Sequence, residues 1–149
     1  FNATAVEVQV DEETGLVDIL KHVTVSDVGH ALNPTQVTGQ DDGAAIMSIG
    51  WALMEHLILD DQGRTRNLGA IDYRIPTSKD LPKEYHSFHI ENHDGPGPYG
   101  AKGMSEGAVL VTAPAIAAAI HDATGAVIRD LPMSPERVWR ALQEVDRPE

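Results

Sequence analysis

A glycine- and proline-rich stretch with one carboxylate is the strongest candidate for chemistry in this sequence. Residues 95–107 read GPGPYGAKGMSEG, and an apolar run begins at Ala108 directly after them. Glycine lets a ligand come close to the backbone, and proline stiffens the loop between such points. The acid in this stretch, Glu106, lies between the loop and a predicted apolar segment, where free backbone N–H groups can bind an anion. Glu106 is therefore a candidate general base, and the simpler alternative is a solvated loop acid.

Other residue combinations support chemistry less well. His86 and His89 lie on one predicted strand, where their side chains point to opposite faces, and His93 follows at its exit. We therefore expect no metal site. Ser105 has no histidine nearby in the sequence to activate it as a nucleophile. The loop matches neither the dinucleotide-binding pattern nor the P-loop, so nucleotide binding is unsupported.

Composition limits the classes of function. A chain of 149 residues that is 42% apolar can form a single domain, 1–149, with its own core. The net charge of −12 argues against nucleic acid or an anionic membrane as partner, and no apolar run approaches the roughly 20 residues that span a bilayer. Cysteine is absent, which excludes disulfides and cysteine ligands to zinc or iron–sulfur clusters. These features are consistent with a cytoplasmic protein, which we expect.

Alternating apolar residues predict several β-strands. The predicted strands span residues 3–10, 16–28, 56–59, 84–91 and 126–129. The first two should pair as an antiparallel hairpin across a polar turn that ends at Gly15. A short extended segment is expected over residues 67–75.

The first predicted helix begins at Pro34, with Asn33 as its N-cap, and continues to Leu53. Three glycines interrupt it, and each costs on the order of 1 kcal/mol against alanine. We therefore expect another helix or a ligand to approach closely there. Tight helix packing accounts for Gly43 and Gly50 without a ligand.

Two further helices follow the glycine-rich loop. Thr112 is predicted to cap an alanine-rich helix over residues 114–123, which is apolar nearly all round and should be buried, and Gly125 ends it. Ser134 and Pro135 open a last helix. The order of elements predicts an α+β fold, with a mixed sheet and short helices packed on one side.

Several ordered motifs resemble one family. The segments GAKGMSEG (100–107), TAPAIA (112–117), DATG (122–125) and LPMSPERV (131–138) are similar to the C-terminal part of the molybdopterin-binding large subunit of the xanthine dehydrogenase/aldehyde oxidase family, the molybdenum hydroxylases. Upstream, the segments DVG (27–29), NP (33–34), GQ (39–40) and DYRIPT (72–77) fit the same subunit in the same order. The match covers nearly the whole chain.

The resemblance implies a role for each matching residue. Glu106 looks like the family's catalytic base, which takes a proton from a hydroxide on molybdenum so that its oxygen can attack an electron-poor carbon. Gln40 looks like the glutamine that hydrogen-bonds the pterin, and Lys102, Gly103, Met104 and Ser105 look like the loop whose backbone approaches the cofactor. Two positions depart from the family: Ser105 stands where glycine is common, and Ser48 stands where a second glutamine is common.

The resemblance also implies what the chain works with. The cofactor would be molybdopterin, with 2Fe-2S clusters and FAD on other chains or domains. The partners would be the remainder of the large subunit, the iron–sulfur and flavin subunits, and a small-molecule substrate, either an aldehyde or an N-heterocycle such as a purine. The family's subunit is much longer, so we expect this chain to be a C-terminal fragment or a split subunit. The alternative is a non-catalytic module of the same fold that serves only in assembly.

Overall fold

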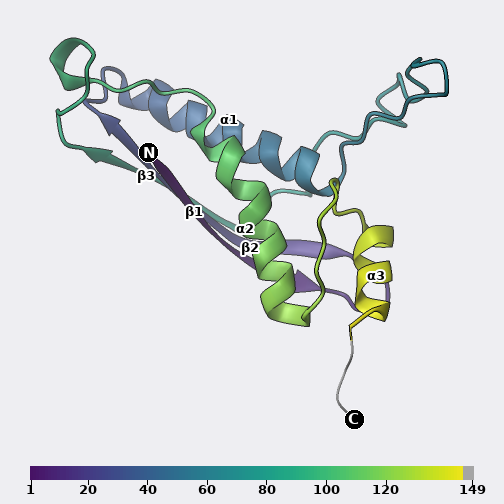
Figure 1. Cartoon of the computed structure of the whole chain (residues 1–149). Helices are drawn as coiled ribbons and strands as arrows, with labels where there is room; N and C mark the ends of the chain where they lie inside the picture. Colours follow the sequence, from purple (N-terminus) through teal and green to yellow (C-terminus); the bar gives the residue numbers. More distant parts are fainter. Residues whose placement is uncertain (146–149) are drawn as a thin grey trace.

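The sheet confirms the predicted hairpin and adds a parallel strand. The computed structural model describes residues 1–145, and within them the strands form one three-stranded sheet in the order β1-β2-β3 (Figure 1). β1 (Asn2–Val10) pairs antiparallel with β2 (Val17–Gly29), and β3 (Glu84–Glu91) runs parallel to β2. The hairpin turn needs Gly15, whose φ is +73° and whose α-carbon faces the backbone at Pro135 so closely that a side chain would collide with it.

The helices α1 (Pro34–Leu53), α2 (Gly107–Thr124) and α3 (Pro135–Gln143) lie on one side of the sheet, as predicted. Figure 1 shows α1 and α2 crossing the same face of the sheet, with α3 at one end. Alternate residues of β1 are exposed and half-buried, which is the pattern of a strand covered on one face. The main core gathers apolar residues from every layer, among them Ile19, Ile49, Ile116, Ile120, Met133 and Val138.

The opposite face of the sheet is uncovered in the described part of the chain. Phe88 and Ile90 on β3 remain 55% and 52% exposed. They lie beside Val25 and Asp27 of β2, with which they are in register. Exposed apolar residues that adjoin in this way indicate a surface for another protein segment.

The start of α1 is as predicted, but close packing of another helix does not explain its glycines. The side-chain oxygen of Asn33 accepts a hydrogen bond from the backbone N–H of Gln36 at 3.1 Å, which is an N-cap. A Cβ at Gly39 or Gly43 would meet nothing within 4 Å, so tight helix packing is the wrong explanation for Gly43. Gly50 does need its small size, because Pro76 of a loop, rather than a helix, presses against it.

The prediction that Thr112 caps the next helix is wrong, because α2 begins at Gly107. The Thr112 hydroxyl is buried and donates to the carbonyl of Ala108 at 2.8 Å, which satisfies it inside the helix. Pro114, which resembled a first-turn proline, is an exposed residue within the helix. Only one side of α2 is buried, and Leu110 is 78% exposed. By length and composition α2 could cross a membrane, but core helices of soluble proteins meet the same test, and α2 packs against β1 and α1.

The strands predicted over 56–59 and 126–129 do not form. The first contributes an isolated bridge between Leu59 and Thr65, and the segment 67–75 contains a turn flanked by irregular chain and forms no strand. Figure 1 shows this part of the chain, between α1 and β3, as an arm that projects from the body. The arm carries apolar side chains that are almost fully exposed, with Leu68 at 85% and Ile71 at 87%. Their β-like sequence therefore has no neighbouring strand here to pair with.

Candidate functional site

A hollow of about 470 Å³ lies between the start of α1 and the glycine-rich loop. It brings together three of the residues predicted to bind a cofactor, namely Gln40 from α1 and Lys102 and Met104 from the loop. Val28, at the end of β2, forms part of its wall. These segments are far apart in the sequence, so their convergence is a result of the fold.

Gln40 reaches this hollow from the second turn of α1. It is half-buried, and within residues 1–145 no protein hydrogen bond is formed by its amide. Gly39 beside it leaves open space where a side chain would point. The pair therefore offers a free amide, with both a donor and an acceptor, next to a bare stretch of backbone.

The glycine-rich loop is fixed to the end of β2 by its own backbone and by Lys102. The N–H of Lys102 donates to the carbonyl of Val28 at 3.0 Å, and its ammonium group contacts Asp27 at 2.6 Å and Asp94 at 2.7 Å. The hydrogen bond between the Lys102 ammonium and the Asp27 carboxylate lowers the pKa of Asp27 and raises that of Lys102. The N–H and ammonium of Lys102 are thus used inside the chain, which leaves its aliphatic stem to line the hollow.

The next residues of the loop have free backbone donors. Within the described residues, no acceptor is present for the N–H groups of Gly103, Met104, Ser105 and Glu106, which lead into the N-terminus of α2. The Met104 side chain packs on the small cluster of Val28, Ala31 and Val37, which holds this segment in place. A row of free N–H groups at a helix N-terminus favours an electronegative ligand.

Glu106 itself is the N-cap residue of α2, and it is exposed. Its side chain makes no capping hydrogen bond, and Ser105 and Gly103 beside it are also exposed. Glu106 does not line the hollow, but it follows Met104, which does, by two residues. Burial of the carboxylate, which a base in a dry active site requires, would have to come from a partner segment.

A buried polar network lies beneath the site and was not predicted. Asp41, next to Gln40, is fully buried; it accepts a hydrogen bond from Ser26 at 2.9 Å and lies 3.1 Å from Nε2 of His89. Asn2 of β1 donates to the same Ser26 hydroxyl at 2.5 Å. A side chain at Gly107, the first residue of α2, would come into ordinary contact with Asn2. The network therefore fastens the helix that carries Gln40 to the three strands.

The same interior holds a histidine that must stay neutral. His22 of β2 is fully buried, with Nε2 3.0 Å from the hydroxyl of Thr112 on α2, and burial lowers its pKa to about 4. Its ring stacks on Tyr85, whose own pKa is raised, mainly by burial. Ser48, which departs from the family's second glutamine, donates to the carbonyl of Val109 at 3.0 Å. These contacts position α1 and α2 and present no group to a ligand.

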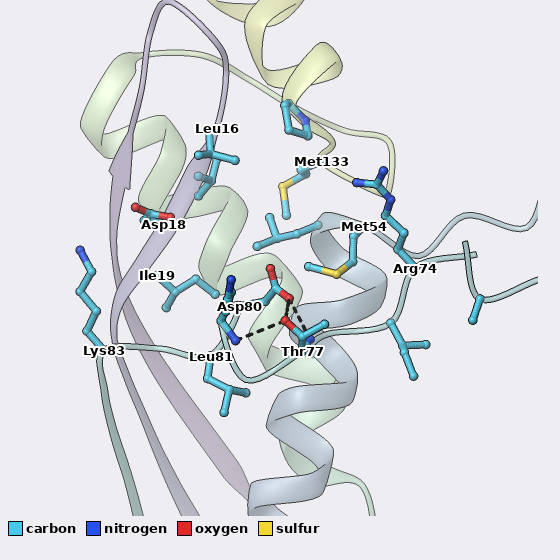
Figure 2. A pocket seen from close by; sticks show the side chains of 16 residues that line it. Leu16, Asp18, Ile19, Met54, Arg74, Thr77, Asp80, Leu81, Lys83 and Met133 are labelled. Carbon is cyan, nitrogen blue, oxygen red and sulfur yellow. Dashed lines mark hydrogen bonds between the residues drawn. The ribbon is translucent and has the colours of Figure 1, made fainter. Parts of the chain in front are cut away.

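A larger hollow, of about 730 Å³, lies at the other end of α1 (Figure 2). Aliphatic side chains such as Ile19, Leu81 and Met133 form much of its lining, with Arg74 and Lys83 also present. The Asp80 carboxylate within it is already satisfied by the N–H and hydroxyl of Thr77, at 2.8 and 2.7 Å. This lining suits contact with an apolar segment better than chemistry.

Comparison with known proteins identifies the family. The profile of the molybdopterin cofactor-binding domain matches residues 1–82, more than half of the chain. The chain belongs to the molybdopterin cofactor-binding domain family. The predicted cofactor class, molybdopterin, is thereby confirmed.

Among individual proteins, the chain is 39% identical over 140 residues to the putative xanthine dehydrogenase molybdenum-binding subunit XdhA of Escherichia coli, covering 93% of this chain and 18% of that subunit. It is 34% identical over 145 residues to the probable hypoxanthine oxidase XdhD of the same organism, covering 97% of this chain and 15% of that protein. The chain thus spans less than a fifth of the length of these relatives.

Solved structures agree with the fold. Quinoline 2-oxidoreductase from Pseudomonas putida 86 superimposes with a TM-score of 0.81 at 35% identity, over 95% of this chain and 18% of that one. Aldehyde oxidoreductase from Desulfovibrio gigas superimposes with a TM-score of 0.85 at 30% identity, over 95% of this chain and 15% of that one. The predicted mixed sheet with helices on one side is therefore the fold of the matched part of these two proteins.

Proposed function

We propose that this chain forms the part of a molybdenum hydroxylase active site that faces the cofactor and supplies its catalytic base. The observation that carries the proposal is the hollow that Gln40, Lys102 and Met104 line together. Met104 precedes Glu106 by two residues. In the complete protein the reaction would be oxidation of an aldehyde or an N-heterocycle at an electron-poor carbon, with water as the oxygen source.

The residues around the hollow fit a molybdopterin. The pterin is a planar, polar heterocycle rich in hydrogen-bonding edges, and the free Gln40 amide and the free N–H groups of Gly103 to Glu106 are suitable partners for it. When bound, the cofactor supplies the metal and the redox chemistry, while the protein supplies position and electrostatics. Met104 and the stem of Lys102 would give the hollow an apolar wall against the ring.

Glu106 would act by taking up a proton. It is the N-cap residue of α2, a helix that packs against β1 and α1, so the backbone that carries its carboxylate has a defined position. A positioned base contributes about 10²–10⁴ in rate. The base works best where water is excluded, and we propose that the remainder of the large subunit closes over Glu106 in the complete protein.

The exposed apolar surfaces support this partner. The arm between α1 and β3 presents Leu68 and Ile71, and the open face of the sheet presents Phe88 and Ile90. Each would be buried by a large neighbouring segment of the same subunit. Iron–sulfur and flavin subunits or domains would then accept the electrons, and the whole assembly would be cytoplasmic.

The test uses the complete protein with Glu106→Gln, and Glu144→Gln as the control, because Glu144 is an exposed acid at the end of α3. We expect Glu106→Gln to lose turnover while molybdenum content equals that of the wild type, and Glu144→Gln to keep both. Near-normal turnover of Glu106→Gln would instead support the alternative, a non-catalytic assembly module.

A further inference from the structure

Two histidines and a glutamate meet where β2 and β3 end, on the rim of the hollow. His30 follows β2, Glu91 is the last residue of β3, and His93 lies two residues further on. One ligand atom from each lies within 4.8 Å of the other two. The imidazole rings of His30 and His93 stack with their centroids 4.7 Å apart and their planes 27° apart, and each ring has a nitrogen near the carboxylate.

The closest pair in this cluster has the spacing of two metal ligands. Nδ1 of His30 lies 3.2 Å from Oε2 of Glu91, where a protonated imidazole would form an ion pair, and the nitrogen is shielded from solvent. Zinc binds imidazole nitrogen at about 2.0–2.1 Å and carboxylate oxygen at about 2.0–2.2 Å. At the tetrahedral angle, two such ligands lie about 3.4 Å apart. The two atoms therefore face one another as ligands of a shared ion would.

The backbone around the cluster is held by several independent bonds. Oε2 of Glu91, the oxygen that faces His30, also accepts from the N–H of Ala31 at 2.9 Å, which orients the carboxylate. The N–H of His30 donates to Gly100 at 3.1 Å, and the N–H of Asn92 donates to Gly29 at 3.0 Å. Such outer hydrogen bonds orient ligands in known metal sites.

His93 is held in an unusual conformation. Its φ is +54°, in the left-handed region that is uncommon for residues other than glycine, although histidine adopts it more often than most. A conformation of this kind costs of order 1–3 kcal/mol and persists where the surroundings require it. Here it turns the imidazole of His93 onto that of His30.

The local charge also favours a cation. Among residues 1–145, three carboxylates lie in this region, those of Glu91, Asp27 and Asp94, and the ammonium group of Lys102 is paired with both aspartates. With neutral imidazoles, the region keeps an excess of negative charge.

We propose that His30, Glu91 and His93 bind a divalent transition-metal ion such as zinc, on the rim of the hollow that Gln40, Lys102 and Met104 line. Two imidazoles and a carboxylate form a ligand set typical of such ions and leave a position for water. The ion would join the end of β2 to the segment that leads into the glycine-rich loop. The site does not depend on Glu106 or on turnover.

The experiment uses the complete protein, treated with a chelator and then titrated with Co²⁺ as a spectroscopic probe and with Zn²⁺. We expect one equivalent of Co²⁺ per chain, with the visible absorption of a four-coordinate site, displaced by Zn²⁺. His93→Gly should fold, because glycine readily adopts the positive φ of this position. We expect it to weaken Zn²⁺ binding more than about 100-fold, which exceeds the loss of affinity when only an outer hydrogen bond to a ligand is removed. His30→Gln should do the same.

His86→Gln is the matched control, because His86 is an exposed histidine of β3 outside the cluster. It should bind Zn²⁺ like the wild type. Equal binding by wild type and His93→Gly would mean an adventitious ion only, and absence of Co²⁺ binding in the wild type would overturn the proposal as well. Molybdenum content and turnover, measured on the same samples, report separately on the proposed function.

Discussion

Replacing the buried Asp41 with alanine should loosen α1 from the sheet. The substitution removes the acceptor of Ser26, 2.9 Å away, and a partner of His89 and of Ser87, 3.1 and 3.4 Å away. Each buried polar group left without a partner costs about 1–3 kcal/mol, which gives about 2–6 kcal/mol for Ser26 and for the His89–Ser87 pair, whose polar atoms lie 3.4 Å apart. Because the His89 side chain is 17% exposed and can turn to water, we expect the lower part of that range, about 2–4 kcal/mol.

Amide hydrogen exchange on peptides from α1, in the complete protein, measures this loss locally. At 1.36 kcal/mol per factor of ten, exchange should accelerate roughly 30- to 1,000-fold. Asp41→Asn keeps an oxygen for Ser26 and should fall between alanine and wild type. Thr38→Ala, an exposed change on the same helix, should have less than about a threefold effect. An effect of Asp41→Ala no larger than that of Thr38→Ala would refute the network's role.

Three other predictions concern stability and cofactor retention. Burial lowers the pKa of His22 from 6.5 to about 4, so between these pH values the unfolded chain binds a proton at His22 that the folded chain does not bind. The free energy of unfolding should therefore fall by up to about 3 kcal/mol as the pH drops through this window. Unfolding of the wild type and of His22→Gln, measured as a function of pH, gives the difference. Gly15→Ala introduces a side chain at φ +73° against the Pro135 backbone, and thermal unfolding should show a loss of more than about 2 kcal/mol. The 149-residue chain alone should not retain molybdenum, and a stoichiometric amount by metal analysis would contradict this.

The elements that could be predicted from the sequence are those with local signals. The Asn33–Pro34 pair defines the start of α1, Gly125 ends α2 at φ +77°, and alternation over residues 84–91 gives β3 with its observed bounds. The sequence around Thr112 was misread because a threonine two residues before a proline is typical of a helix start. The same pair also fits inside a helix when the proline ring faces outward. The strand prediction for the arm between α1 and β3 was wrong for another reason. β-propensity depends on packing against neighbouring strands, and the arm has none here.

The site could be predicted only in part. The glycine-rich loop and Gln40 were accessible through motifs, and the structure brings Gln40, Lys102 and Met104 to one hollow. Their roles, with those of Gly103, Ser105 and Glu106, stay predictions, as does the single-domain organisation.

The buried network and the histidine cluster could not be predicted, because both depend on the parallel pairing of β2 with β3, which joins residues far apart in the chain. An aspartate at position 41 on the apolar side of α1, between Val37 and Ala44, was a signal that sequence reasoning had available. A buried acid in such a place requires partners.

The most direct measurement of the central claim is the rate at which substrate reduces the complete protein in a single turnover, followed by rapid mixing without an electron acceptor. This rate contains the proton transfer assigned to Glu106 and excludes the later electron-transfer steps. With equal molybdenum content, Glu106→Gln should be slower than the wild type by about 10²–10⁴. A rate within about threefold of the wild type would contradict the assignment of Glu106 as the base.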